Sequence, residues 1–116
     1  YLLAAARDRG LLELESAVHK LTDVPARLYG LKDRGRIEEG WWADLVVFDA
    51  QKVAPDEIEV REDLPGGGWR LYSEAIGVHH VFINGEQAVK DGAFTEARPG
   101  TLLRSGRDTE KITANG

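Results

Sequence analysis

The sequence predicts a mainly β fold preceded by two helices. Leu45–Phe48 is an unbroken apolar run rich in β-branched and aromatic residues, which is typical of a strand buried on both faces. A second apolar stretch, Ile76–Ile83, leads directly into Asn84-Gly85, the strongest short-range signal for a β-hairpin. Before these strands, apolar residues recur at three- and four-residue spacing from Leu11 to Leu21, as along one face of an α-helix.

The composition fits one soluble, globular domain. Of the 116 residues, 42% are hydrophobic and 30% are charged, which distinguishes the chain from a disordered protein. The formal net charge of -5 comes with no basic face, so nucleic acids and anionic membranes are poor candidate partners. The chain contains no cysteine, which excludes disulfides and thiolate metal sites and fits a cytoplasmic location.

The helical part is expected in the first 31 residues. Tyr1–Arg9 favours helix, and the periodic segment that follows forms the first amphipathic helix. Thr22 and Asp23 are cap-type residues, and we expect the second helix over Pro25–Leu31. His19 lies at the edge of the apolar face and is interpreted as a helix-edge residue, not as a metal ligand.

The start of the chain suggests a piece of a longer protein. The sequence contains no methionine and opens at Tyr1 with residues typical of the middle of a helix, without a preceding cap. We therefore expect that the chain is cut from a larger polypeptide, and that its helices pack on a body outside this sequence.

Short strands and turns are expected from Lys32 onward. Ala43–Asp49 is the central strand, and Arg61–Tyr72, which contains Pro65-Gly66-Gly67-Gly68, is interpreted as an exposed loop. The remaining expected features are a short strand at Ile37, a polar excursion over Gln51–Val60 with a turn at Pro55-Asp56, a return strand over Glu86–Lys90, a turn at Asp91-Gly92, a last strand over Thr101–Arg104, and a fraying tail over Ser105–Gly116.

Four polar residues are interpreted as structural. His79 and His80 are neighbours on a predicted strand, so their side chains point to opposite faces and are poorly placed to chelate one ion. Asp44 precedes the central strand and is either a functional carboxylate or, as we favour, an acceptor of backbone N–H groups at a turn or bulge. Arg34 is expected to form an ion pair with Glu38 or Glu39.

The candidate substrate-binding residue is Arg70. It lies in the aromatic-Arg-aromatic stretch Trp69–Tyr72, which reaches a carboxylate substrate if the loop extends over an active site. The alternative, which we favour, is that Trp69 and Tyr72 pack onto the sheet.

Gly66-Gly67-Gly68 lacks the sequence context of a phosphate-binding loop. Trp41-Trp42 marks a surface where other parts of the protein dock.

The order and spacing of these segments resemble the C-terminal region of amidohydrolase-superfamily metal-dependent hydrolases. The resemblance covers residues 11–104, and its details are most similar to the N-acyl-D-amino-acid deacylase (D-aminoacylase) branch. The segments that carry it are Lys20-Leu21-Thr22, Pro25-Ala26, Gly30-Leu31, Arg34-Gly35-Arg36-Ile37, Gly40, Ala43–Asp49, Val81–Gly85 and Asp91-Gly92, with Leu31–Gly35 and Pro99–Arg104 pointing to the branch.

The resemblance implies a β-sandwich that accompanies a metal-binding (β/α)8 barrel. Residues 1–31 would form the end of the barrel, residues 32–104 the C-terminal portion of the sandwich, and residues 105–116 a flexible tail. The parent protein would hydrolyse a non-peptide C–N amide bond, with zinc or a similar divalent metal activating water. The family's His-x-His motif does not occur in this sequence, so no catalytic or metal-binding residue is assigned and the chain alone is expected to be inactive.

Two other interpretations remain open. The chain is a free-standing β-rich binding or scaffolding module, or it belongs to a cyclic-amidase or deaminase branch of the same superfamily. In the favoured interpretation, the partners are the rest of the parent barrel and a second copy of the chain, which pairs through unpaired edge strands in a homodimer.

Overall fold

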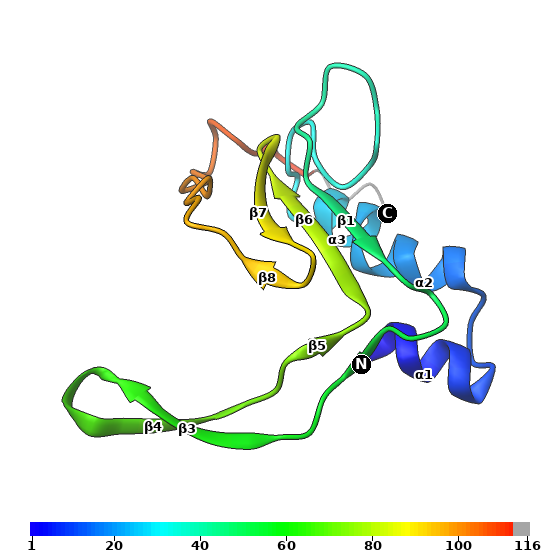
Figure 1. The fold of residues 1–116 in the computed structure, drawn as a ribbon. Coiled ribbons are helices and arrows are strands. Elements are labelled where there is room, and N and C mark those ends of the chain that lie inside the picture. Colours follow the sequence, from blue (N-terminus) through cyan, green and yellow to red (C-terminus); the bar gives the residue numbers. More distant parts are fainter. Residues whose placement is uncertain (113–116) are drawn as a thin grey trace.

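The computed structural model describes residues 1–112, which form three helices followed by short antiparallel strands (Figure 1). The mainly β fold class predicted from the sequence is confirmed. The elements are α1 (Leu2–Arg9), α2 (Leu14–Leu21), α3 (Asp23–Leu28), β1 (Leu45–Phe48), β2 (Ala54–Pro55), β3 (Glu59–Leu64), η1 (Pro65–Gly67), β4 (Gly68–Tyr72), β5 (Ala75–Ile76), β6 (Val78–Ile83), β7 (Glu86–Lys90) and β8 (Ala93–Phe94).

The three helices pack through small residues. Ala6 of α1, Ala17 of α2 and Ala26 of α3 are the buried apolar residues of the helical part. Their short side chains let the helices approach closely, while the longer apolar residues of the same helices remain exposed. The predicted second helix begins two residues earlier than expected, at Asp23, and ends at Leu28, before Gly30.

The main sheet has four antiparallel strands in the order β1-β6-β7-β8. Asn84 and Gly85 connect β6 to β7 with φ of 52° and 83°, and Asp91 and Gly92 connect β7 to β8 with φ of 50° and 79°. Two consecutive residues with positive φ give the turn the twist that matches a hairpin. Both predicted hairpin turns are therefore confirmed.

The prediction that Leu45–Phe48 is a central strand buried on both faces is wrong. It forms β1, the edge strand of the sheet, which pairs with β6 alone among the described residues. Val46 and Val47 are 55% and 47% exposed. The composition of the run is that of a doubly covered strand, but no layer within residues 1–112 covers it.

The segment predicted as an exposed loop, Arg61–Tyr72, is part of a β-hairpin. Strands β3 and β4 pair in antiparallel register and are joined by the 3₁₀ turn η1, in which Gly66 and Gly67 adopt φ of 76° and 72°. The preceding segment, predicted as a polar excursion, contains β2, which pairs with β5 at the base of this hairpin. The hairpin projects away from the helices and the main sheet as a separate arm (Figure 1).

Two predicted strands are absent from the described residues. Ile37 is 89% exposed in an irregular segment, and Thr101–Arg104 has no strand partner. The chain after residue 104 differs from the predicted fraying tail, because Thr109 forms a β-bridge with Leu31 and the N–H of Glu110 donates to the carbonyl of Gly30 at 2.8 Å. The part of the predicted tail at residues 113–116 lies outside the described residues.

The hydrophobic core is small for the composition. Within residues 1–112 the buried hydrophobic residues are Ala6, Ala17, Ala26 and Val53, and no large side chain is fully buried. The radius of gyration is 16.6 Å, whereas a compact chain of this length has about 13 Å. Most large apolar side chains therefore lie on the surface. No helix in the described part of the chain has the length and hydropathy needed to cross a membrane.

Gly77→Ala should destabilise the fold more than Gly40→Ala. Both glycines have positive φ, at 74° and 85°, so each alanine costs about 1–2 kcal/mol in backbone conformation. A Cβ at residue 77 would also lie 2.8 Å from the backbone nitrogen of Val53, whereas nothing lies within 4 Å of one at residue 40. This overlap should cost about 1–3 kcal/mol more. Urea titrations of both variants measure the difference, and equal midpoints would contradict the packing argument.

Candidate functional site

Arg34, Asp44 and Asn84 form a polar junction between three segments of the chain. One Asp44 carboxylate oxygen accepts the backbone N–H of Asn84 at 2.8 Å, and the other pairs with the Arg34 guanidinium. Arg34 also donates to the Asn84 side-chain oxygen at 2.6 Å, and the Asn84 amide donates to the carbonyl of Pro99 at 2.6 Å. The Arg34 side chain is only 12% exposed, whereas the Asp44 side chain is 35% exposed, so the junction is shielded on the arginine side and open to solvent at Asp44.

The junction confirms one sequence prediction and corrects another. Asp44 accepts a backbone N–H at a turn, as expected. Arg34, however, does not pair with Glu38 or Glu39 in the described residues, because its guanidinium is engaged by Asp44 and Asn84. The neighbouring Arg36 takes the predicted contact instead, at 3.7 Å from Glu38.

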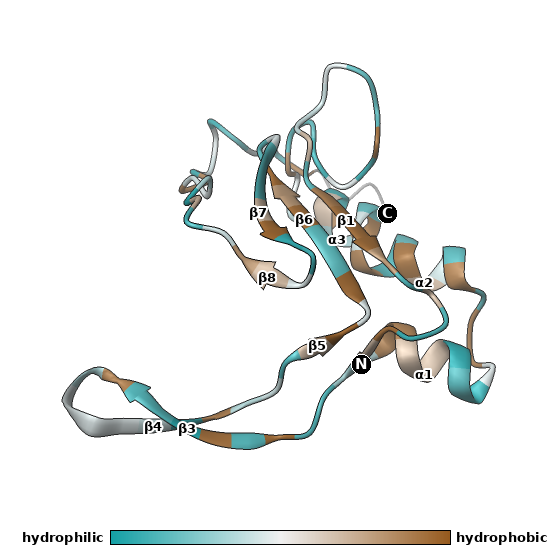
Figure 2. Cartoon of the chain, viewed as in Figure 1, coloured by the Kyte–Doolittle hydropathy of each residue, from teal (hydrophilic) through white to brown (hydrophobic). Residues whose placement is uncertain are grey.

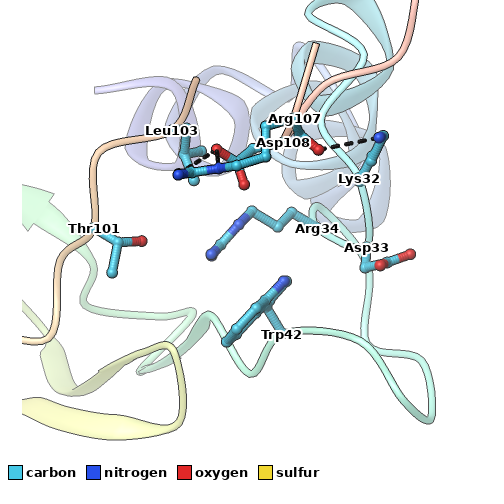
Figure 3. Close-up of a pocket in the computed structure, with 8 residues that line it drawn as sticks. All are labelled: Lys32, Asp33, Arg34, Trp42, Thr101, Leu103, Arg107 and Asp108. Atoms are coloured by element: carbon cyan, nitrogen blue, oxygen red, sulfur yellow. Dashed lines mark hydrogen bonds and ion pairs between the residues drawn. The ribbon is translucent and has the colours of Figure 1, made fainter. Parts of the chain in front are cut away.

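A small hollow of about 170 Å³ lies beside this junction (Figure 3). Arg34 projects into it between Trp42 and the segment 101–108, and its guanidinium lies 5.0 Å from the Trp42 ring centroid. Lys32 donates to the carbonyl of Arg107 at 3.0 Å, and Asp33 points away from the hollow. Because its cations already contact acceptors of the chain, the hollow is best described as a structural junction.

Asp108 helps to close the hollow. The Arg107 guanidinium hydrogen-bonds to its carboxylate and, with the backbone N–H of Arg104, lowers the pKa of Asp108 below the usual value. Asp108 therefore stays ionised near neutral pH and holds the turn that carries Thr109 to its bridge with Leu31.

Arg70, the candidate substrate-binding residue, lies on the projecting hairpin. Its guanidinium makes a two-pronged contact with Asp63, at 2.8 and 2.7 Å, and this pairing lowers the pKa of Asp63 and raises that of Arg70. Arg70 and Arg61 both stack on Tyr72, at 4.7 and 3.8 Å from the ring centroid. Arg61 in turn pairs with Glu59 and Glu74, and these carboxylates raise its pKa.

The favoured prediction that Trp69 packs onto the sheet is wrong. Trp69 is 67% exposed on the hairpin, and Tyr72 is covered by the two arginine side chains instead of by the main sheet. The alternation of side chains along β3 and β4 separates the indole from the ion pairs. Arg70 is thus carried on an arm that extends from the body of the chain (Figure 1).

The histidines form no metal site within the described residues. His79 is exposed, whereas His80 is half-buried and contacts the Gln87 amide and the backbone N–H of Asp91. No group of three or more His, Asp or Glu side chains within residues 1–112 is arranged to hold a metal ion. The residues described here therefore do not fit a metal centre.

Sequence reasoning missed the role of Asp23. Interpreted as a cap-type residue, it is instead 5% exposed and accepts from His19, Arg27 and Arg36 at 3.1, 2.8 and 3.2 Å. Burial raises its pKa, but the hydrogen bonds from Arg27 and His19 outweigh burial and leave it lowered. His19 lies four residues before Asp23, on α2, and Arg27 lies four residues after it, on α3. Side chains at this spacing meet on a helical surface, so the spacing itself indicated these contacts.

Comparisons with known proteins give consistent matches. The model of the amidohydrolase family matches residues 3–89. N-acyl-D-glutamate deacylase of Alcaligenes xylosoxydans xylosoxydans is 44% identical over 84% of this chain, and a dihydroorotase of Archaeoglobus fulgidus is 31% identical over 83%. A solved structure, described as addressing the binuclear metal center in D-aminoacylase, superposes with a TM-score of 0.66 at 36% identity over 85% of the chain.

The chain is short compared with these proteins. It spans 18% of the deacylase, 23% of the dihydroorotase and 19% of the D-aminoacylase structure. The similarity thus concerns about a fifth of each.

Asp23→Asn should lower stability at neutral pH and lose its effect in acid. Because the folded pKa of Asp23 lies below 3.8, the carboxylate stabilises the fold above that pH, and this contribution is lost as the pH falls through the folded value. Urea midpoints of both proteins, measured at pH 7 and at successive steps below pH 3.8, follow the change. Asp33→Asn makes the same substitution at a side chain directed away from the hollow and should have little effect (Figure 3). A gap between Asp23→Asn and the unmodified chain that does not shrink as the pH falls below 3.8 would contradict the assignment.

Proposed function

The chain belongs to the amidohydrolase family, and from this we propose that it forms the C-terminal, β-rich part of a metal-dependent hydrolase that deacylates N-acyl-D-amino acids. The observation that carries the proposal is the 44% identity to N-acyl-D-glutamate deacylase over 84% of the chain. The structural likeness to D-aminoacylase supports the same branch. The reaction is hydrolysis of a C–N amide bond that is not a peptide bond.

A second candidate is a cyclic-amide hydrolase. The observation in its favour is the 31% identity to a dihydroorotase over nearly the same share of the chain. We place it second because the identity to the deacylase is 13 percentage points higher over a similar span. Both candidates are hydrolases of C–N bonds within one family, so they differ in substrate and not in reaction class.

In this proposal the chemistry belongs to residues outside those described. The side chains within residues 1–112 form no cluster that could hold a metal ion, so we assign no step of the reaction to them. A divalent metal of the zinc class would be held by the rest of the parent protein and would supply activated water there. This chain would contribute a framework that packs against the barrel.

The exposed apolar surfaces support this framework role. Leu11, Leu28 and Tyr29 of the helical part are 61%, 67% and 69% exposed, and the edge strand β1 leaves Val46 and Val47 uncovered. Exposed apolar side chains on the helices and on an edge strand are suited to contact with another body. We propose that residues 1–31 complete the end of the barrel and that residues 32–104 form the sandwich portion beside it. A free-standing module would need these surfaces to be covered in another way.

The chain alone should neither hydrolyse N-acetyl-D-glutamate nor bind stoichiometric zinc. The physical reason is that metal-bound hydroxide needs several convergent ligands, which the described residues lack. Amine release and elemental analysis of the purified chain measure both properties, with an active N-acyl-D-glutamate deacylase as the positive control. Turnover by the chain, or one zinc per molecule, would contradict the proposal that the metal and the reacting residues lie outside this chain.

In the full-length protein, Arg70→Ala should raise KM for acidic substrates about tenfold. An arginine contact with a carboxylate is worth about 1.5–3 kcal/mol, and part of it is offset because Arg70 must leave Asp63. Steady-state kinetics with N-acetyl-D-glutamate and N-acetyl-D-leucine separate a charge effect from a general one. Arg61→Ala, on the same face of the hairpin, is the matched control. If kcat/KM of Arg70→Ala is unchanged for the acidic substrate, Arg70 does not bind it.

A further inference from the structure

The turn between β6 and β7 contains a dipeptide, Asn84-Gly85, that is chemically labile. Glycine has no Cβ to obstruct the asparagine side chain, so the side-chain amide can be lost without an enzyme. The Gly85 backbone nitrogen bonds to the Asn84 Cγ atom while the C–N bond of the side-chain amide breaks, and the amide leaves as ammonia with the Gly85 proton. Water then opens the resulting five-membered ring to give aspartate or isoaspartate.

Solvent reaches this dipeptide within the described part of the chain. The turn lies where the apolar end of β6 gives way to the polar start of β7 (Figure 2). Asn84 is half-buried and Gly85 is exposed, and no atom beyond the adjacent residues lies within 4 Å of the position that a Cβ would occupy at residue 85. Burial therefore does not keep water from the turn, and the reactivity of the amide depends on its hydrogen bonds.

Every group that must change in the reaction is engaged by another part of the chain. The Gly85 N–H, which must lose its proton, donates to the carbonyl of Ala43 at 3.0 Å. The Asn84 side-chain oxygen accepts from Arg34, and its amide nitrogen donates to the carbonyl of Pro99, each at 2.6 Å. Departure of ammonia breaks the contact with Pro99, and rotation of the amide towards Gly85 breaks the contact with Arg34 as well.

We propose that Asn84 is a deamidation site that the contact with Arg34 keeps unreactive. Arg34 holds the side-chain oxygen of Asn84 directly, and it pairs with Asp44, which accepts the Asn84 backbone N–H. Loss of the guanidinium therefore weakens the hold on both the side chain and the backbone of the turn. The turn then opens locally more often, and the open form is the one that reacts.

The product cannot rebuild the junction. An aspartate at residue 84 would accept from Arg34, but its carboxylate has no N–H to donate to the carbonyl of Pro99. It would also place a second negative charge beside Asp44. Isoaspartate adds a methylene group to the backbone of the turn, and the length of the turn sets the register of β6 and β7. Deamidation would thus leave a lasting change at the junction.

Peptide mapping of the full-length protein after prolonged incubation at mildly alkaline pH tests the proposal. Trypsin releases residues 71–90, in which Asn84 is the only asparagine, and fragmentation in the mass spectrometer measures its conversion. An unincubated sample gives the conversion that occurs during digestion. The native protein should deamidate at Asn84 about tenfold or more slowly than the same protein unfolded in urea, because a hydrogen bond to a charged group must break before the turn opens.

Variants of two arginines separate the junction from general stability. Arg34→Ala should remove most of the protection, and Arg34→Lys, which keeps the charge but not the planar fork, should give an intermediate rate. Arg36→Ala is the matched control, because this arginine of the same segment pairs with Asp23 and stacks on Trp41. It should deamidate at the rate of the unmodified protein. Circular dichroism verifies that each variant is folded.

Three results would overturn the proposal. Equal rates in the native and the urea-unfolded protein would show that the fold does not protect Asn84. Full protection in folded Arg34→Ala would show that the junction is not its cause. A slower reaction in that variant than in the unmodified protein would show that the guanidinium polarises the Asn84 carbonyl and promotes attack. If Arg34→Ala does not fold, the rate in folded Arg34→Lys decides in the same way.

Discussion

The contact of Arg34 with Asp44 and Asn84 is the interaction on which the arrangement of the sheet depends. It joins the irregular segment after the helices to the start of β1, to the β6–β7 turn and, through Pro99, to the chain beyond β8. These segments have little apolar core between them, so their relative position is set by polar contacts with defined geometry. A change at Asp44 would release the backbone of Asn84 and the Arg34 guanidinium together.

The turns of the fold could be predicted from the sequence because their causes are local. Asn84-Gly85 and Asp91-Gly92 tolerate positive φ, and that preference is a property of the residues themselves. The strand order and the partners of Arg34 could not be predicted in this way. Asp44 and Asn84 lie 10 and 50 residues from Arg34, whereas the sequence suggested the adjacent Glu38 and Glu39.

Burial was harder to predict than element type. Leu45–Phe48 was correctly assigned as a strand, but its exposure depends on what lies above it, which the residues of the strand do not specify. The hairpin over residues 59–72 was missed because Pro65 and three glycines are typical of a loop. This signal was stronger than the alternation of apolar and polar residues on either side, which indicated strands. The candidate residue Arg70 was consequently expected in a loop, whereas the strand pairing places it opposite Arg61 and beside Asp63.

The bridge between Leu31 and Thr109 closes the β part into one loop that begins and ends just after α3. The chain leaves the helices at residue 31, passes through all three sheets, and returns to bond beside the same residue, with Lys32 and Gly30 held by Asp108 and Glu110. Because the entropic cost of closing a loop rises only with the logarithm of its length, a loop this long costs little more to close than a short one. Backbone contacts of residues 30–32 with residues 108–110 thus hold both ends of the β part beside α3, so a change that breaks them releases the two ends together.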